Sequence, residues 1–183
     1  MKFTPTSLPG AFIVDVERIE DERGFFARSF CCEEFRAQGL DPEIVQTNLS
    51  YNRKIGTLRG LHLQVAPHEE AKLVTCIEGS IFDVIVDVRP GSATFGRTIS
   101  VELNRDNRRG LFIPKGFAHG FQSLRDDTTV SYQMSQTYHP QSARGILWND
   151  PALHIDWPIK NPIMSDRDAT FGPLSSCDLG VTQ

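Results

Sequence analysis

The sequence predicts an all-β fold, and three observations lead to this prediction. Short segments rich in β-branched and aromatic residues recur along the chain, proline and glycine separate them, and hardly any stretch has a helical pattern. Segments of this kind are typical of an antiparallel sandwich or barrel. Because 183 residues can bury one core without disulfides or a structural metal, we expect a single domain over residues 1–183.

The expected strands follow one another at short intervals. In chain order they are residues 11–16, 24–30, 44–49, 57–64, 72–78, 81–88, 97–103, 110–113, 116–124 and 129–134. One short amphipathic helix is expected over Cys32 to Gln38, because Gly39 follows it and is a common helix terminator.

The C-terminal segment has a different character. From residue 138 onward it contains too many prolines for a continuous strand or helix. Trp148 and Trp157 give it apolar anchors that a disordered tail lacks. We therefore expect N-terminal strands in 1–50, a barrel core in 51–137 and an irregular, ordered C-terminal wrap in 138–183.

The strand at 81–88 has two unlike faces. One face carries only apolar side chains, whereas the other alternates Ile81, Asp83, Ile85 and Asp87. A carboxylate between aliphatic neighbours is costly to bury unless it is paired. Asp83 is therefore expected to face either solvent or a polar, ligand-binding interior.

Charge and composition argue against several functional classes. The net charge is −4 with both signs interspersed, so no footprint for nucleic acid or a membrane surface is apparent. The N-terminus lacks an apolar signal segment and no apolar run is long enough to span a bilayer, which predicts a cytoplasmic protein. The cysteines, at 31, 32, 76 and 177, form no C-x-x-C pair and are interpreted as structural or incidental thiols.

Polar residues interrupt the apolar strands at a few places that are candidates for chemistry. These are His62 at the end of Arg59-Gly60-Leu61-His62, His119 in the segment 114–120, and Tyr132 between Val130 and Met134. Each is ambiguous alone, because a single histidine is often exposed or simply hydrogen-bonded and a strand tyrosine is usually part of the core.

Strand alternation adds a constraint on two of these positions. His62 and Arg59 point to opposite faces of a regular strand, so both reach one site only if the strand bends. Gly60 between them is where a bulge would be tolerated. Lys72 shares a face with Val74 and Cys76, so it either has a function inside the barrel or extends from the strand end to solvent.

These clusters belong to a longer series of motifs. The series comprises Asp21–Phe26, Gln46–Ser50, Leu58–His62, Lys72–Val74, Phe82–Asp87, Gly91–Gly96, Ile113–Phe121, Gly145–Pro151 and Ser165–Asp168. In these motifs the sequence closely resembles the dTDP-4-dehydrorhamnose 3,5-epimerase family, a branch of the cupins, over nearly the whole chain. The resemblance implies a jelly-roll barrel, no cofactor, and a homodimer to which the strands in 1–50 contribute by joining the partner's sheet.

The resemblance also implies catalytic roles on a 4-keto-6-deoxy nucleotide sugar. His62 corresponds to the general base, Asp168 to its dyad partner and Tyr132 to the acid on the opposite face of the sugar. The chemistry fits, because the carbonyl acidifies the neighbouring C3 and C5 hydrogens and an imidazole, with an unperturbed pKa of about 6.5, suits their removal. Lys72 is our candidate for stabilising the enolate.

Further residues are expected to bind the substrate. Arg23 and Arg59 would hold the diphosphate, because planar guanidinium groups match phosphate oxygens. Phe26 would stack on the base or ribose, with a core role as the alternative. The remaining predicted contacts are Gln46, Asn48, Asp83, His119, Tyr138 and Arg167.

A metal site is not expected. His62, Gln64, Glu69 and His119 loosely follow the ligand spacing of metal-binding cupins, but Gln64 stands where a second histidine is needed and is a poor ligand. A metal-dependent cupin and a non-catalytic sugar-binding cupin remain the alternatives from other classes.

Three positions depart from the family's usual residues. Arg28 and Ala143 stand where glutamates are common, and Arg167 stands where a lysine is common. The nucleotide, dTDP, CDP or GDP, is therefore open at this point, and so is inversion at C3 alone, C5 alone or both.

Overall fold

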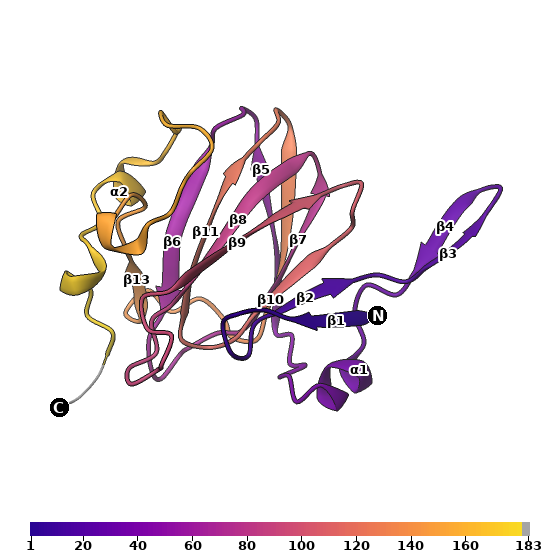
Figure 1. The fold of residues 1–183 in the computed structure, drawn as a ribbon, viewed down its shortest axis with the longest axis horizontal. Helices are drawn as coiled ribbons and strands as arrows, with labels where there is room; N and C mark the ends of the chain where they lie inside the picture. Colours follow the sequence, from indigo (N-terminus) through magenta and orange to yellow (C-terminus); the bar gives the residue numbers. More distant parts are fainter. Residues whose placement is uncertain (181–183) are drawn as a thin grey trace.

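Two antiparallel sheets face each other in the computed structural model, which describes residues 1–180 (Figure 1). The six-stranded sheet has the order β1 (Lys2–Pro5), β2 (Phe12–Asp15), β10 (Gly110–Ile113), β7 (Lys72–Glu78), β12 (Thr128–Met134) and β5 (Gln46–Asn52). The five-stranded sheet has the order β13 (Ala143–Gly145), β6 (Leu58–Gln64), β11 (Phe117–Ser123), β8 (Ser80–Asp87) and β9 (Thr98–Asn104). This two-layered jelly roll confirms the predicted all-β fold.

The remaining elements are short. A separate hairpin consists of β3 (Arg18–Asp21) and β4 (Gly24–Ala27), and the helices are α1 (Cys32–Ala37) and α2 (Asp166–Ala169). Single 3-10 turns lie at Pro151–Leu153 and Leu174–Ser176. No helix within residues 1–180 is long and apolar enough to cross a membrane.

Each expected strand is present within a few residues of its predicted bounds, and so is the helix at Cys32. Three strands, β1, β3 and β13, were not expected. β3 reads Arg-Ile-Glu-Asp and is exposed throughout, and β13 is only Ala-Arg-Gly, so neither has the alternation that predicts a strand. β1 pairs with β2, and β2 pairs with β10, so both strands belong to the six-stranded sheet of their own chain.

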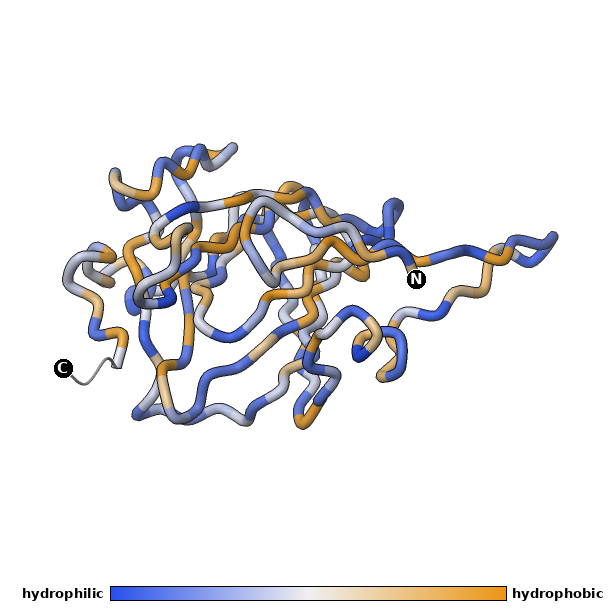
Figure 2. The backbone as a smooth tube through the Cα atoms, turned by 60° about the horizontal axis from the view of Figure 1, so that its bottom comes forward, coloured by the Kyte–Doolittle hydropathy of each residue, from blue (hydrophilic) through white to orange (hydrophobic). Residues whose placement is uncertain are grey.

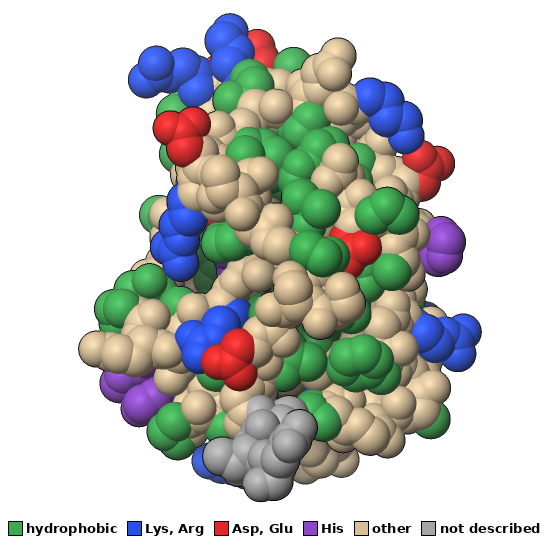
Figure 3. All heavy atoms as spheres, turned by 90° about the vertical axis from the view of Figure 1, so that its left-hand side faces the viewer, with side chains coloured by type: hydrophobic (Ala, Val, Ile, Leu, Met, Phe, Trp, Pro, Cys, Tyr) green, Lys and Arg blue, Asp and Glu red, His purple; other side chains and the backbone are tan. Residues whose placement is uncertain are grey.

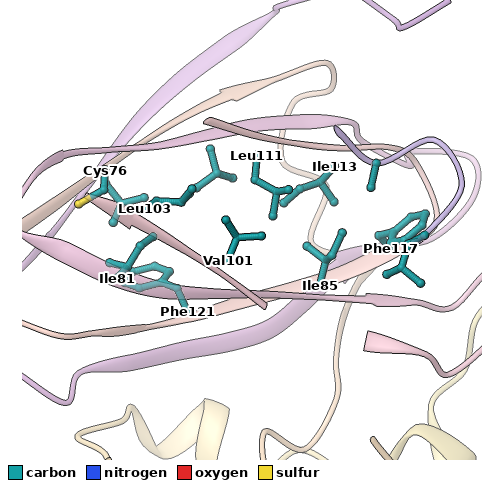
Figure 4. Close-up of a cluster of buried hydrophobic side chains, with 13 residues drawn as sticks. Cys76, Ile81, Ile85, Val101, Leu103, Leu111, Ile113, Phe117 and Phe121 are labelled. Carbon is teal, nitrogen blue, oxygen red and sulfur yellow. The ribbon is translucent and has the colours of Figure 1, made fainter. Parts of the chain in front are cut away.

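The core lies between the sheets. Its side chains come from β7 to β12 and point toward one another between the two layers, as Figure 4 shows for Ile81, Ile85, Leu111 and Phe121. Asp83 lies on the same face of β8 as Ile81 and Ile85 and is fully buried. Of the two expectations for Asp83, the polar interior is therefore the correct one.

The C-terminal segment covers the outer face of the five-stranded sheet. Leu61 and Leu63 of β6 and Val84 of β8 pack there against Leu153 and Trp157. The Trp157 indole donates a hydrogen bond to the Trp148 carbonyl oxygen at 2.7 Å, and this bond joins two parts of the C-terminal segment. Figure 3 views the molecule from this side, with hydrophobic side chains in the middle and charged ones mostly around them. The expected wrap is present, and its last residues, 181–183, lie outside the described part.

The β3–β4 hairpin extends away from the sandwich (Figures 1 and 2). Its apolar side chains are exposed in the single chain, Ile19 to 70% and Phe26 to 73%. Helix α1 packs near the base of the hairpin, where Phe35 is buried against the outer face of the six-stranded sheet beside Phe112. The hairpin is therefore the part of the chain that is least supported by its own core.

A pair of isoleucine variants tests which side chains hold the sandwich together. Ile85→Ala removes a side chain that is 0% exposed between the sheets, and should lower the free energy of unfolding by about 2–5 kcal/mol. Ile77→Ala, at a position 41% exposed, should cost much less. Urea unfolding of both proteins measures the difference, and equal losses would contradict this description of the core.

Candidate active site

Two adjoining cavities open between the sheets. One, of about 330 Å³, is lined by Asn48, Leu49, Ser50, Arg59, His62, Lys72, His119, Phe121, Tyr132 and Met134. The other, of about 310 Å³, is lined by Gln46, Asn48, His62, Leu63, Gln64, Glu70, Lys72, Met134, Gln136, Tyr138, Ala143, Arg144 and Arg167. His62 and Lys72 line both, so one continuous space runs past them.

A bulge in β6 brings Arg59 and His62 to this space together. His62 pairs with His119 of β11, whereas Arg59 pairs with Phe121, so β6 has one residue more than β11 over this stretch. The bulge requires Gly60, whose φ is +116° and whose added Cβ would lie 2.7 Å from the Gly120 Cα. The bend expected at Gly60 is therefore present.

Asp168 holds the His62 imidazole. The His62 Nε2 lies 2.8 Å from Asp168 Oδ1, and the Gly60 backbone N–H donates to Asp168 Oδ2 at 3.1 Å. Ser165 caps the short helix α2 by accepting a hydrogen bond from the Asp168 backbone N–H, which places the carboxylate. With Nε2 bound to the carboxylate, Nδ1 is the ring nitrogen that remains for a ligand.

The ionisation of Asp168 is governed by opposing effects. Burial favours the neutral acid, but the hydrogen bonds from His62, Gly60 and Ser165 outweigh it and lower the pKa of Asp168 below its usual value. Asp168 is therefore an anion at neutral pH, suited to orient His62 and to stabilise its protonated form.

Aromatic packing fixes the His62 ring from another side. Phe171 meets it edge-on, with centroids 5.8 Å apart and planes at 89°. Phe171 fits only because residue 145 is glycine, since a Cβ there would lie 2.2 Å from its ring. The guanidinium group of Arg167 lies over the same Phe171 ring, with its Cζ 5.8 Å from the ring centroid.

Tyr132 faces the same cavity from the other sheet. Its ring packs against His119 at a centroid distance of 6.0 Å, and His119 Nε2 lies 2.7 Å from Asp83 Oδ1. Burial, and next the charge of Asp83, raise the pKa of Tyr132 well above its usual value. Tyr132 is therefore a neutral phenol at physiological pH, with a proton to donate.

Lys72 has a partner that the sequence analysis missed. Its Nζ lies 2.9 Å from Glu70 Oε1, and the two side chains are only 7% and 4% exposed. Glu70 precedes Lys72 by two residues, and that spacing on an extended chain places both side chains on one face. The same alternation that drew attention to Lys72 would have found Glu70. Arg144, which lines the cavity and pairs with Asp178, was also missed.

Two predicted substrate contacts lie far from the cavities of their own chain. Arg23 pairs with Asp21 at the exposed hairpin, and Phe26 is exposed beside it. Neither lines either of the two cavities, because β3 and β4 extend away from the sandwich, so their roles in substrate binding stay predictions. The other predicted residues line the cavities, or in the case of Asp83 and Asp168 hold a histidine that does.

The metal-like spacing does not produce a cluster. Among residues 1–180 no group of three or more histidine, cysteine, aspartate or glutamate side chains is placed to hold a metal ion. The Gln64 side chain instead binds the backbone of His68, Thr137 and His139, and Glu69 lines a separate small cavity. Each of the two histidine rings is instead hydrogen-bonded to a single carboxylate, His62 to Asp168 and His119 to Asp83.

The Asp168 carboxylate predicts an acid sensitivity of the fold. Because its folded-state pKa is lowered, its ionisation stabilises the protein fully above the ordinary value of 3.8 and this contribution is lost as pH falls through the folded-state pKa. Asp168→Asn should therefore unfold with a shallower pH dependence below about pH 4. Urea unfolding at several pH values measures it, with Asp166→Asn, on the exposed side of α2, as the control. Parallel curves for Asp168→Asn and the unaltered protein would contradict this.

Comparison with known proteins agrees with this geometry. The dTDP-4-dehydrorhamnose 3,5-epimerase family profile matches residues 5–176. A dTDP-4-dehydrorhamnose 3,5-epimerase from Shigella flexneri is 44% identical over 169 residues, which are 92% of this chain and 93% of that protein.

Solved structures show the same likeness. The dTDP-4-dehydrorhamnose 3,5-epimerase of Bacillus anthracis, with TDP and PPi bound, has a TM-score of 0.91 and 40% identity, covering 94% of this chain and 98% of that chain. The dTDP-6-deoxy-D-glucose-3,5-epimerase of Legionella pneumophila, in complex with dTDP-4-keto-L-rhamnose, has a TM-score of 0.92 and 38% identity, covering 98% and 95%.

The structure of an enzyme with a narrower activity is also similar. A 3′-monoepimerase from Streptomyces bikiniensis, in complex with dTDP-quinovose, has a TM-score of 0.88 and 35% identity, covering 94% of this chain and 87% of that chain. The resemblance seen in the motifs is confirmed by the family profile and by these identities. A chain with this sandwich, this cavity and these relatives belongs to the dTDP-4-dehydrorhamnose 3,5-epimerase family, a family of isomerases.

Proposed function

We propose that this protein inverts C3 and C5 of a dTDP-linked 4-keto-6-deoxy sugar, with His62 as base and Tyr132 as acid. One observation carries the proposal. An imidazole fixed by a carboxylate on one sheet and a neutral phenol on the opposite sheet line the same cavity. A sugar ring between them would have a proton acceptor on one face and a proton donor on the other.

The reaction then follows from the positions of the groups. His62 Nδ1 takes the proton next to the carbonyl, and the electron pair moves onto the C4 oxygen as an enolate. The Lys72 ammonium, which lines both cavities, stabilises that oxygen. Tyr132 then protonates the carbon from the other face, and exchange of the two side chains with water restores the imidazole and the phenol.

The remaining cavity residues suit a nucleotide diphosphate. Arg59 and Arg167 supply guanidinium groups to the two cavities, and Arg59 is oriented by a 2.8 Å hydrogen bond from its Nε to Asn52 Oδ1. Gln46 and Asn48 present amides from β5, and Tyr138, 56% exposed, lies at the cavity rim where it can pack on a base.

The active form is a homodimer in this proposal. Arg23 and Phe26 cannot serve the cavity of their own chain, and the hairpin that carries them extends from the sandwich with exposed apolar side chains. Both facts are accounted for if the N-terminal region of each chain reaches the partner's cavity. The binding roles of Arg23 and Phe26 are proposed on that basis.

Several expectations remain predictions beside this proposal. The enzyme needs no cofactor or metal and acts in the cytoplasm. dTDP is the proposed nucleotide because the bound relatives carry TDP or dTDP sugars. Arg28 pairs with Glu34 in the single chain, and Ala143 lines the cavity beside Arg144, so neither departure from the family's usual residues places a new charge in the cavity of this chain.

Deuterium exchange tests the proposed reaction. Incubation with 4-keto-6-deoxyglucose linked to dTDP, CDP or GDP in D2O, followed by NMR, should show deuterium at C3 and C5 of the dTDP sugar. His62→Asn should abolish exchange, whereas Tyr132→Phe should keep exchange and lose inversion, because only the return of the proton is removed.

The outcomes separate the alternatives. Deuterium at C3 alone would identify a monoepimerase, and a preference for CDP or GDP would correct the nucleotide. Unchanged turnover in either variant would contradict the assigned roles, and an absence of exchange with all three substrates would contradict epimerase activity.

Mixing two inactive variants tests the shared site. If Arg23 serves the partner, a heterodimer of Arg23→Ala and His62→Asn chains contains one site with both native residues. Mixed and refolded chains should therefore regain activity that neither variant has alone. Arg53→Ala, outside the cavities, is the matched arginine control. No recovery in a mixture shown to contain heterodimers would mean that the hairpin does not complete the neighbouring site.

A further inference from the structure

Glu70 lies in the cavity wall with a carboxylate that the proposed reaction does not use. Its side chain is 4% exposed, and its Oε2 has no hydrogen-bond partner among residues 1–180. The Lys72 ammonium, 2.9 Å from Oε1, is its one ion-pair partner in that part of the chain. The pair is isolated, so each charge depends on the other.

Such a pair is poorly explained by stability alone. Two buried charges lose their hydration, and their mutual attraction commonly only offsets that loss. An apolar pair of the same size would therefore stabilise the fold equally well. What an ion pair supplies is a charge held at a defined place. Here that place is the wall shared by the two cavities, where Lys72 is proposed to meet the sugar.

The surroundings of Lys72 are mostly cationic or neutral. The titratable and charged side chains that line the two cavities with it are Arg59 and His62 from β6, His119 from β11, Tyr132 from β12, Tyr138, Arg144 from β13 and Arg167 from α2, in addition to Glu70. Asp41 and Glu43 line a small third cavity with Lys72, and Asp41 pairs with Lys115. Asp168 and Asp83 are already hydrogen-bonded to the two histidines. Glu70 is thus the carboxylate that can balance the ammonium directly.

We propose that Glu70 is a positioning residue that holds the Lys72 ammonium in the cavity wall, aimed at the sugar carbonyl. The inference rests on the proposed function, because it assigns Lys72 the enolate. Without the Glu70 carboxylate, the Lys72 ammonium would lose the one ion-pair partner that it has within residues 1–180, and its Nζ would no longer be fixed in the wall. A displaced ammonium would no longer stabilise the enolate.

Glu70 also constrains where the substrate lies. A carboxylate repels a diphosphate, so the uncharged sugar, and not the phosphates, must lie against Glu70 and Lys72. The phosphates then lie toward the guanidinium groups of Arg59 or Arg167. The effect of Glu70 should therefore fall on turnover and hardly on the binding of the nucleotide diphosphate.

Glu70→Gln isolates the charge, because an amide oxygen can still accept from Lys72 at the same distance. The kcat of deuterium exchange should fall about tenfold, because a neutral amide holds the ammonium more weakly at the enolate oxygen. The inhibition constant of dTDP should stay within about twofold. Glu69→Gln, which removes the adjacent carboxylate outside the two cavities, should match the unaltered enzyme.

An unchanged kcat in folded Glu70→Gln would overturn the inference, and so would a loss of dTDP binding equal to the loss of turnover. If Glu70→Gln does not fold, Glu70→Asp carries the test, because it keeps the charge and shortens its reach. Lowered kcat with unchanged dTDP inhibition is expected there, and kinetics identical to the unaltered enzyme would overturn it. Failure of the proposed function is distinguishable, because the unaltered enzyme would then show no exchange at all.

Discussion

The extra residue in β6 at Gly60 is the constraint on which the rest of the site depends. Without it, strand alternation would send Arg59 and His62 to opposite faces of the sheet. With it, Leu61 packs outward against the C-terminal segment, while the side chains of Arg59 and His62 both reach the cavity. The Gly60 N–H, released from regular pairing, holds Asp168. One backbone irregularity thus places the proposed base, orients its carboxylate and brings the arginine that is proposed to bind phosphate to the cavity.

A common electrostatic arrangement surrounds the cavity. Each of three proton-carrying or cationic side chains has its own carboxylate: His62 with Asp168, His119 with Asp83, and Lys72 with Glu70. The carboxylates are largely buried behind or beside the group that they serve, so the charges that a ligand would meet are set in advance. Preorganisation of this kind suits enolate chemistry, in which charge develops on one oxygen and no bond to the protein forms.

Ten strands could be predicted from the sequence because each of them alternates apolar and polar residues or forms a compact apolar run, and the alternation in β8 also revealed its two faces, whereas β1, β3 and β13 were missed. Asp83 shows the limit, since alternation placed it on the face opposite Val84 but by itself favoured solvent over the interior. The hydrogen bond between Asp83 of β8 and His119 of the neighbouring strand β11 places it in the interior. Glu70 was missed because it precedes the strand, and the position of the β3–β4 hairpin was missed because no local pattern states where an exposed hairpin points.

The proposed catalytic residues were assigned through motifs rather than through chemistry inferred from their spacing. His62 and Asp168 are separated by 106 positions, and only the fold of the C-terminal wrap onto β6 brings them to 2.8 Å. Phe171 has no signal of its own in the sequence, although it packs against the imidazole, and nothing in the motif that begins at Gly145 shows that this glycine makes room for Phe171. Long-range packing of this kind follows from the tertiary structure and not from local propensity.

A crystal structure of the protein with a bound dTDP-6-deoxy sugar tests the central claim most directly. The sugar ring should lie between the His62 imidazole and the Tyr132 hydroxyl, with its C4 oxygen within hydrogen-bonding distance of Lys72 Nζ. A ring bound with both side chains on the same face, or bound outside the space that they share, would contradict it.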